Sequence, residues 1–356
     1  MKWTALFLVL ALLVSCAPAA SLPDATSLPS PVARHTAQPS VTPFPSPTRA
    51  PTWTPEPAAT TAGLLITPSP NSQYGILALR VRQYGGGQVE NLGNMGNFNG
   101  FTRYHIRYPS DGLNIDGFAN IPRGDGPFPI IIVLHGYTDP STYETLDYTT
   151  DAADNLAGQG YIVLHPSYRN FPPSDSGDTL FRVGYAIDVL NLIAIVQQSA
   201  RQPGLFEHAN PSKIGLWAHS MGGDIALKVA EISPYIKAVL LYSSMSGDEK
   251  INSKFFKNYT GSPENNLELQ ASDQEFALIS PDHYYQNITA AIQIHHGKAD
   301  SVVPVSVAEE TCQKMKDARL DIRCYYYDGA DHTFLRRDTQ EFSPRVVTFF
   351  AKYLKK

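Results

Sequence analysis

The chain has 356 residues, 43% of them hydrophobic and 17% charged, which suits one large globular domain or two smaller ones. Its formal net charge is −5, and no run of Lys or Arg occurs apart from the terminal pair Lys355 and Lys356. These values exclude an electrostatic basis for nucleic-acid binding.

The N-terminal stretch MKWTALFLVLALLVSC has the layout of an export signal. Lys2 is followed by an apolar run over 3–14 that is shorter than the roughly 20 residues needed to span a bilayer. A short transmembrane anchor is the alternative interpretation. Leu-Val-Ser-Cys, ending at Cys16, resembles the lipobox of bacterial lipoproteins. The resemblance implies a signal peptide over 1–15, a diacylglyceryl group on Cys16 and an extracytoplasmic protein anchored to the cell membrane, since two acyl chains suffice for stable anchoring.

Residues 16–70 form a segment rich in Pro, Ser and Thr, as in PSVTPFPSPTRAPTWTPEP. Proline at this density removes ladder donors and breaks helices, so the segment is predicted to be an extended, disordered linker. It serves either as a stalk that lifts the folded domain off the membrane or as a plain spacer. The folded domain is predicted over 71–356.

The first part of this domain contains three segments with strand character, namely LALRVRQY, TRYHIRYP and NIDGFANIP. From residue 129 onward, short apolar runs alternate with segments of helical periodicity. The apolar runs, predicted as buried strands, are PIIIVLHG, YIVLHPSYR, KIGLWAHS, IKAVLLYSS, AAIQIHHG and DIRCYYYDG.

Helices are predicted between these strands. A capping box at 141–144 opens one that ends near Gly158 or Gly160, and apolar residues over 183–194 mark another. MGGDIALKVAEI is a third, Ser306 caps a fourth that ends near Leu320, and Ser343-Pro344 begins the last. A polar insertion over 247–287 interrupts the pattern. The alternation predicts an α/β fold in which a mostly parallel central sheet carries helices on both faces.

Two cysteines remain in the predicted domain, Cys312 in a helix and Cys324 in the strand after it. In an oxidising compartment they either form a disulfide or stay as two buried thiols, and the sequence leaves both alternatives open.

Ser220 stands between the strand KIGLWAHS and the helix MGGDIALKVAEI. A sharp turn at this point pushes the hydroxyl over the sheet edge where ligands bind, and it requires small neighbours such as Ala218 and Gly222. The helix N-terminus adds free N–H groups and a partial positive charge. A plain helix cap is the alternative. Because Gly222 and Gly223 cost the helix about 1 kcal/mol each, a nucleophile is the favoured interpretation.

AHSMGG resembles the nucleophile elbow of α/β-hydrolases, with Ala218 in the first position as in small secreted bacterial lipases. In that family an acid and then a histidine follow the serine. Asp300 in KADSVVP and His332 in ADHTF each follow a predicted strand and resemble the loops that carry these groups. The resemblance implies a triad in which Asp300 orients His332 and His332 activates Ser220. The alternatives are a helix or turn cap for Asp300, a surface loop histidine for His332, and the neighbouring Asp331 as the acid.

His135-Gly136 resembles the H-G element that supplies half of the oxyanion hole in the same family. The resemblance implies that the N–H groups of Tyr137 and Met221 stabilise the oxyanion. A plain strand-ending turn is the alternative for His135-Gly136. The side chain of His219 is expected to point away from the site. No metal-binding motif is present, and we expect neither a metal nor a cofactor.

Over 103–356 the chain is similar to the catalytic domain of the prolyl-oligopeptidase family and its dienelactone-hydrolase-like relatives, including the hairpin YPSDGLNIDGFANIP. It departs from the peptidases in lacking room for a β-propeller, and from dienelactone hydrolases in having serine rather than cysteine as nucleophile. The resemblance implies a serine hydrolase that cleaves small-molecule esters through an acyl-enzyme. A serine peptidase acting on short peptides is the alternative, and an inactive binding protein on a hydrolase scaffold is a more remote one.

The insertion over 247–287 is expected to roof the substrate pocket. Six side chains at or just past strand ends are expected to line it: Tyr137, Tyr143, Tyr168, Phe171, Tyr242 and Met245. The alternative is that several of them belong to the core.

Overall fold

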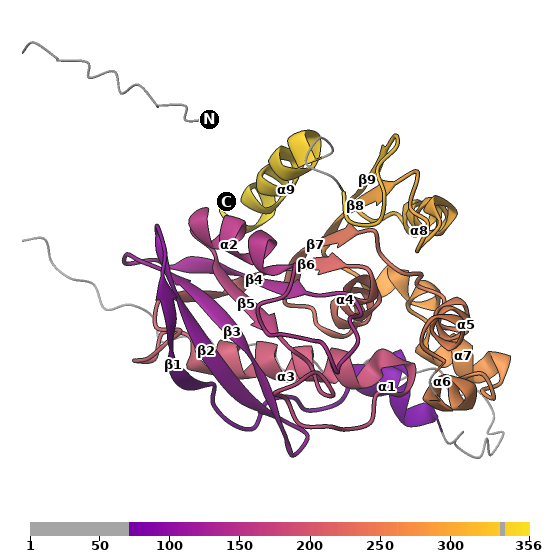
Figure 1. Ribbon diagram of the computed structural model, residues 1–356, viewed down its shortest axis with the longest axis horizontal. Helices are drawn as coiled ribbons and strands as arrows, with labels where there is room; N and C mark the ends of the chain where they lie inside the picture. The colour runs from indigo at the N-terminus through magenta and orange to yellow at the C-terminus, as the bar shows by residue number, and fades with distance from the viewer. Residues whose placement is uncertain (1–70, 262, 335–338) are drawn as a thin grey trace, which may run out of the picture. The chain divides into compact units, whose positions relative to one another are not determined.

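The computed structural model describes residues 71–261, 263–334 and 339–356, so the predicted signal peptide, Cys16 and the linker to residue 70 lie outside the described residues. Within these ranges nine strands form one sheet in the order β1-β2-β3-β5-β4-β6-β7-β8-β9 (Figure 1). The pairs β1-β2, β2-β3 and β3-β5 are antiparallel. The remaining pairs, β5-β4, β4-β6, β6-β7, β7-β8 and β8-β9, are parallel. The strands are β1 (Glu90–Asn97), β2 (Phe101–Ser110), β3 (Leu113–Pro122), β4 (Phe128–Leu134), β5 (Ile162–Pro166), β6 (Ala209–His219), β7 (Ile236–Tyr242), β8 (Ala291–Gly297) and β9 (Ile322–Tyr327).

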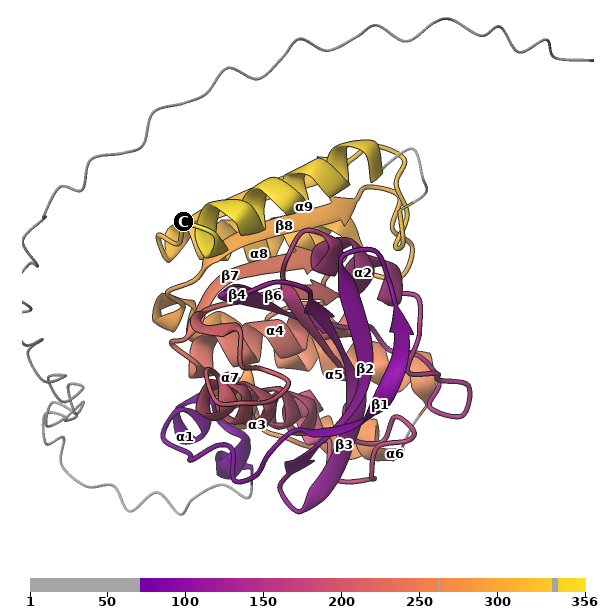
Figure 2. The same ribbon diagram turned by 90° about the vertical axis from the view of Figure 1, so that its left-hand side faces the viewer.

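Helices cover both faces of the sheet, as Figures 1 and 2 show. One core cluster joins the sheet to α1 (Ile76–Arg80), α3 (Val183–Ser199), α4 (Met221–Ile232) and α8 (Val305–Asp317). The other joins it to α2 (Thr150–Gly158) and α9 (Thr339–Leu354). In β4, successive residues alternate between the two clusters, so the strand is apolar throughout because both of its faces are buried. The predicted mostly parallel α/β sheet is confirmed.

The polar insertion between β7 and β8 folds into α5 (Glu249–Thr260), α6 (Pro263–Glu268) and α7 (Asp273–Ile279). A buried ion cluster, made of Arg182, Asp224, Lys228, Glu249 and Glu268, ties it to the rest of the domain. Arg182 pairs with Glu249, with Asp224 at 3.3 Å and with Glu268 at 3.3 Å. Lys228 pairs with Asp224 and with Glu249 at 2.6 Å. Removing one partner from such a buried cluster leaves an uncompensated charge, which costs about 3–5 kcal/mol.

At the N-terminal end of the domain one prediction was wrong and one strand was missed. LALRVRQY, predicted as a strand, contains most of α1, because Ile76 and Leu79 are buried at helical spacing in the same cluster as α4. The Asn- and Gly-rich strand β1 was not predicted at all. Its bulges follow Asn91 and Asn94, whose side chains accept the N–H two residues on, and this irregular edge strand has no apolar alternation to reveal it.

Three helix starts also differ from the prediction. Ser141 opens no helix, because its N–H and hydroxyl both bind Asp139, and α2 begins only at Thr150. The N-cap of α8 is Pro304, so Ser306 lies inside the helix rather than capping it. The last helix begins at Thr339, four residues before Ser343. Local capping signals were therefore overridden by nearby side-chain bonds and by packing.

Cys312 of α8 and Cys324 of β9 form a disulfide, with Cα atoms 6.4 Å apart, which resolves the alternative left open by the sequence. The bond closes a short loop, its cysteines 12 residues apart, and fixes the edge strand β9 to the helix beside it. Loop-closure entropy predicts that the Cys312→Ser/Cys324→Ser variant loses about 3 kcal/mol of unfolding free energy. Guanidinium denaturation with and without reductant measures this. The double variant should not respond to reductant, and equal stability of wild type and variant would contradict the prediction.

Candidate active site

Ser220 occupies a strained turn between β6 and α4, with φ 54° and ψ −118°. Its backbone is held on both sides, since its N–H donates to the Tyr242 carbonyl at 3.0 Å and its carbonyl accepts from Met245 at 3.1 Å. Its side chain makes no cap hydrogen bond with the helix, so the plain-cap alternative is wrong. A non-glycine residue in such a conformation costs about 1–3 kcal/mol and is retained where the surroundings over-determine it.

The small residues of the turn are required by close packing. A methyl group on Gly222 would lie 2.2 Å from the Leu134 carbonyl oxygen, and one on Gly223 would lie 2.0 Å from Ser244 Oγ. Ala218 is fully buried between β4 and β7. The glycines therefore permit the first turn of α4 to approach the ends of the neighbouring strands, which brings Ser220 to the carboxyl edge of the sheet.

Asp300 and His332 meet at the same edge. Asp300 follows β8, and its Oδ2 lies 2.8 Å from His332 Nδ1. Its Oδ1 accepts the N–H groups of Val302 and Val303 at 2.9 and 2.8 Å. Burial alone would raise the pKa of Asp300, but hydrogen bonds from His296, His332 and Val303 outweigh it and lower the pKa below its usual range. Asp300 is therefore a fixed, ionised carboxylate positioned to accept a hydrogen bond from His332 Nδ1.

The rival acid Asp331 does not take this position. Its Oδ1 accepts the N–H of Thr333 at 3.1 Å, and no bond joins it to the His332 ring among the described residues. Among the described residues no hydrogen bond joins Ser220 Oγ to His332 either. Such a bond often forms only in the substrate complex. His332 is nevertheless adjacent to the turn, because its ring centroid lies 4.8 Å from that of His219, the residue before Ser220.

The orientation predicted for His219 was wrong. Rather than pointing away, His219 places Nε2 3.0 Å from the His332 carbonyl oxygen and Nδ1 2.8 Å from the Tyr148 hydroxyl. Tyr148 was not identified from the sequence, because it lies in the loop before α2 in the stretch ETLDYTT, which carries no catalytic pattern. The positions of Tyr148 and His219 depend on contacts between loops that are distant in sequence, and no local sequence pattern indicates such contacts.

The His135-Gly136 element directly borders Ser220. The His135 ring is fixed by a 2.7 Å contact with the Gly136 carbonyl and stacks on Tyr168 at 4.4 Å. A methyl group on Gly136 would lie 3.0 Å from Ser220 Cβ. The N–H of Tyr137 follows directly in the chain, and Met221 is the first residue of α4, whose N–H has no partner within the helix. The two residues predicted to supply oxyanion donors therefore lie close to Ser220, Met221 as its neighbour in the chain and Tyr137 as the residue after Gly136.

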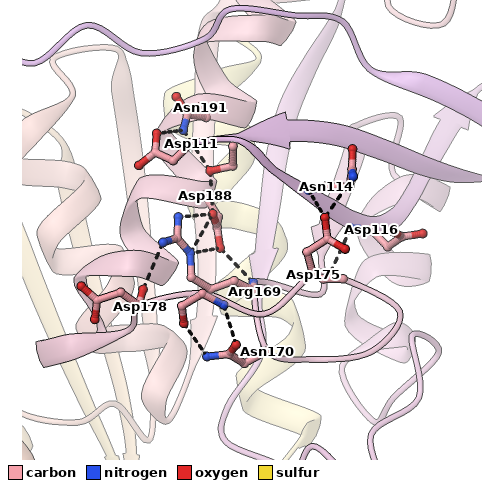
Figure 3. A network of polar contacts seen from close by, with 12 residues as sticks. Asp111, Asn114, Asp116, Arg169, Asn170, Asp175, Asp178, Asp188 and Asn191 are labelled. Carbon is pink, nitrogen blue, oxygen red and sulfur yellow. Dashed lines mark hydrogen bonds and ion pairs between the residues drawn. The ribbon is translucent and has the colours of Figure 1, made fainter. Parts of the chain in front are cut away.

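The loop that supports His135 is held by a buried polar network (Figure 3). Arg169, just past β5, donates to both oxygens of Asp188 in α3 and to the Asp178 carbonyl at 3.0 Å. Ser110 at the end of β2 donates to the same Asp188 at 2.6 Å. The network fixes the loop after β5, whose Tyr168 packs under His135. It follows that the oxyanion element rests on a rigid base.

A cavity of about 350 Å³ lies beside the site, between α2 and α9. Tyr242 lines this cavity, whereas Ser220, Asp300, His332 and the described residues of the insertion do not. Four of the other predicted residues are instead buried in the core, namely Tyr143, Tyr168, Phe171 and Met245. Tyr137 is half-buried and faces the insertion, with its ring 5.8 Å from Phe256 and 6.0 Å from Tyr259. The core alternative is therefore confirmed for Tyr143, Tyr168, Phe171 and Met245, while the roofing of the substrate pocket by the insertion stays a prediction.

Several buried histidines make the fold sensitive to acid. Burial lowers the pKa of His219 and His295 to about 3 and also lowers the pKa of His135 and His165. In the folded protein each of these rings stays neutral, whereas in the unfolded chain it takes up a proton below pH 6.5. The free energy of unfolding therefore falls as the pH is lowered from 6.5 towards 3. At pH 5 the loss is about 2 kcal/mol for His219 and the same for His295. The buried Glu231, whose pKa is raised by burial, acts in the opposite sense.

Urea denaturation at pH 7.5 and pH 5 measures this dependence. We expect the free energy of unfolding to be lower at pH 5 by several kcal/mol. A free energy of unfolding that is unchanged or higher at pH 5 would contradict the assignment of neutral buried rings.

Comparisons with known proteins support the fold. The sequence profile of the dienelactone hydrolase family matches residues 115–348. Esterase EstD of Thermotoga maritima is 28% identical over 123 residues, which cover 33% of this chain and only 28% of that relative. Acetyl xylan esterase 1 of Thermoanaerobacterium sp. JW/SL YS485 superposes with a TM-score of 0.56 at 16% identity, covering 80% of this chain and 94% of the other. Esterase Pf2001 of Pyrococcus furiosus gives 0.54 at 18%, covering 76% and 100%.

At these identities the structural likeness shows the fold, while the sequence profile shows the family. The matched range begins inside β3 and ends inside α9, and it includes Ser220, Asp300 and His332. The chain belongs to the dienelactone hydrolase family and has the α/β-hydrolase fold, as its resemblances predicted.

Proposed function

We propose that this protein is a serine hydrolase that cleaves small carboxylic esters, with Ser220 as nucleophile, His332 as base and Asp300 as the group that orients the base. The observation that carries the proposal is the 2.8 Å contact between Asp300 and His332 beside the strained Ser220 turn. Two of the relatives named above are esterases and one is an acetyl xylan esterase, which supports ester over amide hydrolysis.

The tautomer of His332 determines the chemistry. Because Nδ1–H donates to the ionised Asp300, Nε2 carries the lone pair that accepts the Ser220 proton. Ser220 Oγ attacks the ester carbonyl carbon, and the resulting oxyanion accepts hydrogen bonds from the N–H groups of Tyr137 and Met221. Collapse breaks the ester C–O bond, and the alcohol leaves with the proton from Nε2. Nε2 of His332 then takes a proton from a water molecule, which attacks the acyl-enzyme and releases the carboxylic acid and Ser220.

Active-site labelling and substrate turnover test the proposal. A fluorophosphonate should label the wild-type protein once, and peptide mapping should place the label on Ser220. A panel of p-nitrophenyl esters and aminoacyl or X-Pro amides then separates the alternatives. Amide turnover equal to ester turnover would favour a peptidase. An unlabelled protein without turnover of either class would favour a binding protein on a hydrolase scaffold.

We also propose that the protein is anchored to the cell membrane outside the cytoplasm through lipidated Cys16, on the strength of the Leu-Val-Ser-Cys stretch. Metabolic labelling with a fatty acid should modify the wild-type chain but not the Cys16→Ala variant. Equal labelling of the two would contradict the anchor.

A further inference from the structure

A chain of hydrogen bonds links the two loops that flank Ser220. The Gly136 N–H donates to the Tyr148 hydroxyl at 2.9 Å, and this hydroxyl lies 2.8 Å from His219 Nδ1. His219 Nε2 lies 3.0 Å from the carbonyl oxygen of His332. The chain therefore runs from the loop after β4 to the loop after β9.

The direction of each bond in the chain follows from its ends. A carbonyl oxygen only accepts, so His219 Nε2 must carry a hydrogen. Burial lowers the pKa of His219 to about 3, which leaves the ring neutral at working pH with a lone pair on Nδ1. The Tyr148 hydroxyl therefore donates its single hydrogen to Nδ1, and its oxygen accepts the Gly136 N–H. Both the tautomer of His219 and the rotation of the Tyr148 hydroxyl are thus fixed.

The middle of this chain lies beside Ser220. A methyl group added to Gly136 would lie 2.6 Å from the Tyr148 hydroxyl oxygen, 3.0 Å from Ser220 Cβ and 3.2 Å from His219 Nδ1. At one end, Gly136 directly precedes Tyr137, whose N–H is the proposed oxyanion donor. At the other end is the backbone of His332, the proposed base. Each end thus adjoins a different part of the catalytic machinery.

We propose that Tyr148 and His219 are positioning residues, which hold the oxyanion loop and the base loop at a fixed separation across Ser220. The inference rests on the proposed serine-hydrolase function. Tyr148 is 45% exposed, but its hydroxyl is directed inward to His219, which is buried. Neither side chain needs to touch the reacting atoms. Their effect is on the placement of groups that do, and small misplacements of such groups slow catalysis strongly.

The first test is Tyr148→Phe, which removes the hydroxyl and keeps the ring. We expect kcat for a p-nitrophenyl ester to fall about tenfold with KM changed by less than about twofold, because oriented groups and not substrate contacts are lost. The matched control is Tyr235→Phe, at a tyrosine that is 51% exposed just before β7, and it should leave both constants unchanged. Wild-type kcat in Tyr148→Phe, measured beside an inactive Ser220→Ala, would overturn the inference alone. Activity retained in Ser220→Ala would instead overturn the proposed function.

The second test asks whether Tyr148 and His219 act as one unit. His219→Gln keeps a donor near the Nε2 position and should lose less kcat than His219→Phe, which removes both bonds. Combining Tyr148→Phe with His219→Phe should lower kcat by no more than about twofold beyond the slower single variant, because both substitutions break the same chain of hydrogen bonds. Multiplicative losses would show independent roles and overturn the proposal.

A measurement on the wild-type protein covers the case in which the His219 variants fail to fold. Nitrogen-15 NMR of the histidine rings separates a protonated from an unprotonated ring nitrogen. Between pH 5 and 8 we expect His219 to be protonated at Nε2 and unprotonated at Nδ1. A ring that carries its hydrogen on Nδ1, or that titrates in this range, would overturn the assigned direction of the chain.

Discussion

Replacing Ser220 by Ala is expected to lower kcat for a p-nitrophenyl ester by a factor of at least about 10⁴, to the level left by the oxyanion donors and substrate binding alone. The loss is chemical and not structural, because the hydroxyl makes no cap bond with α4 and Ala fits the same turn. Steady-state kinetics and fluorophosphonate labelling measure the effect, and the thermal unfolding midpoint shows whether the fold is intact.

The matched control is Ser212→Ala, which removes an exposed hydroxyl on the same strand, β6, near its opposite end. This variant should retain the activity of the wild type. Turnover in Ser220→Ala above about one hundredth of the wild-type rate would show that another group is the nucleophile.

Replacing Asp300 by Asn should lower kcat by a factor of about 10³–10⁴ without unfolding the protein. The Asn carbonyl oxygen keeps the bonds from Val302 and Val303, so its NH₂ group faces His332 Nδ1. A donor there forces Nδ1 to accept and moves the ring hydrogen to Nε2, which then cannot take the Ser220 proton. Kinetics with the same ester measure the loss.

Asp331→Asn is the comparison for this experiment, since Asp331 is the neighbouring acid that binds only the Thr333 backbone among the described residues. We expect it to keep wild-type kcat. If Asp331→Asn is inactive and Asp300→Asn is active, the assignment of the acid is wrong.

The sheet was predictable from sequence because its strands are buried on both faces, which leaves uninterrupted apolar runs such as PIIIVLHG and IKAVLLYSS. Ser220, Asp300 and His332 could be placed at one edge because each follows such a run and parallel strands share their carboxyl edge. The same logic fails for β1, whose exposed Asn and Gly residues carry no apolar signal, and for α1, which is too short for its period to be read.

Tyr148, His219 and the ion cluster could not be predicted for a different reason. Each depends on pairs far apart in the chain, such as His219 with His332 or Arg182 with Glu268. A lone charged or aromatic residue in sequence says nothing about whether a partner will be buried beside it. Such pairs are set by the crossover connections of the sheet and not by local pattern.

The buried ion cluster constrains how this enzyme can acquire new specificity during evolution. The insertion supplies two of its carboxylates, Glu249 and Glu268, whereas Arg182 and Lys228 belong to the segments beneath it. Exchanging the insertion for that of a relative would leave two buried cations with Asp224 as their shared counter-ion, unless the incoming segment also brought acids at matching positions. Recombination of whole insertions should therefore succeed only between sequences that share this charge pattern.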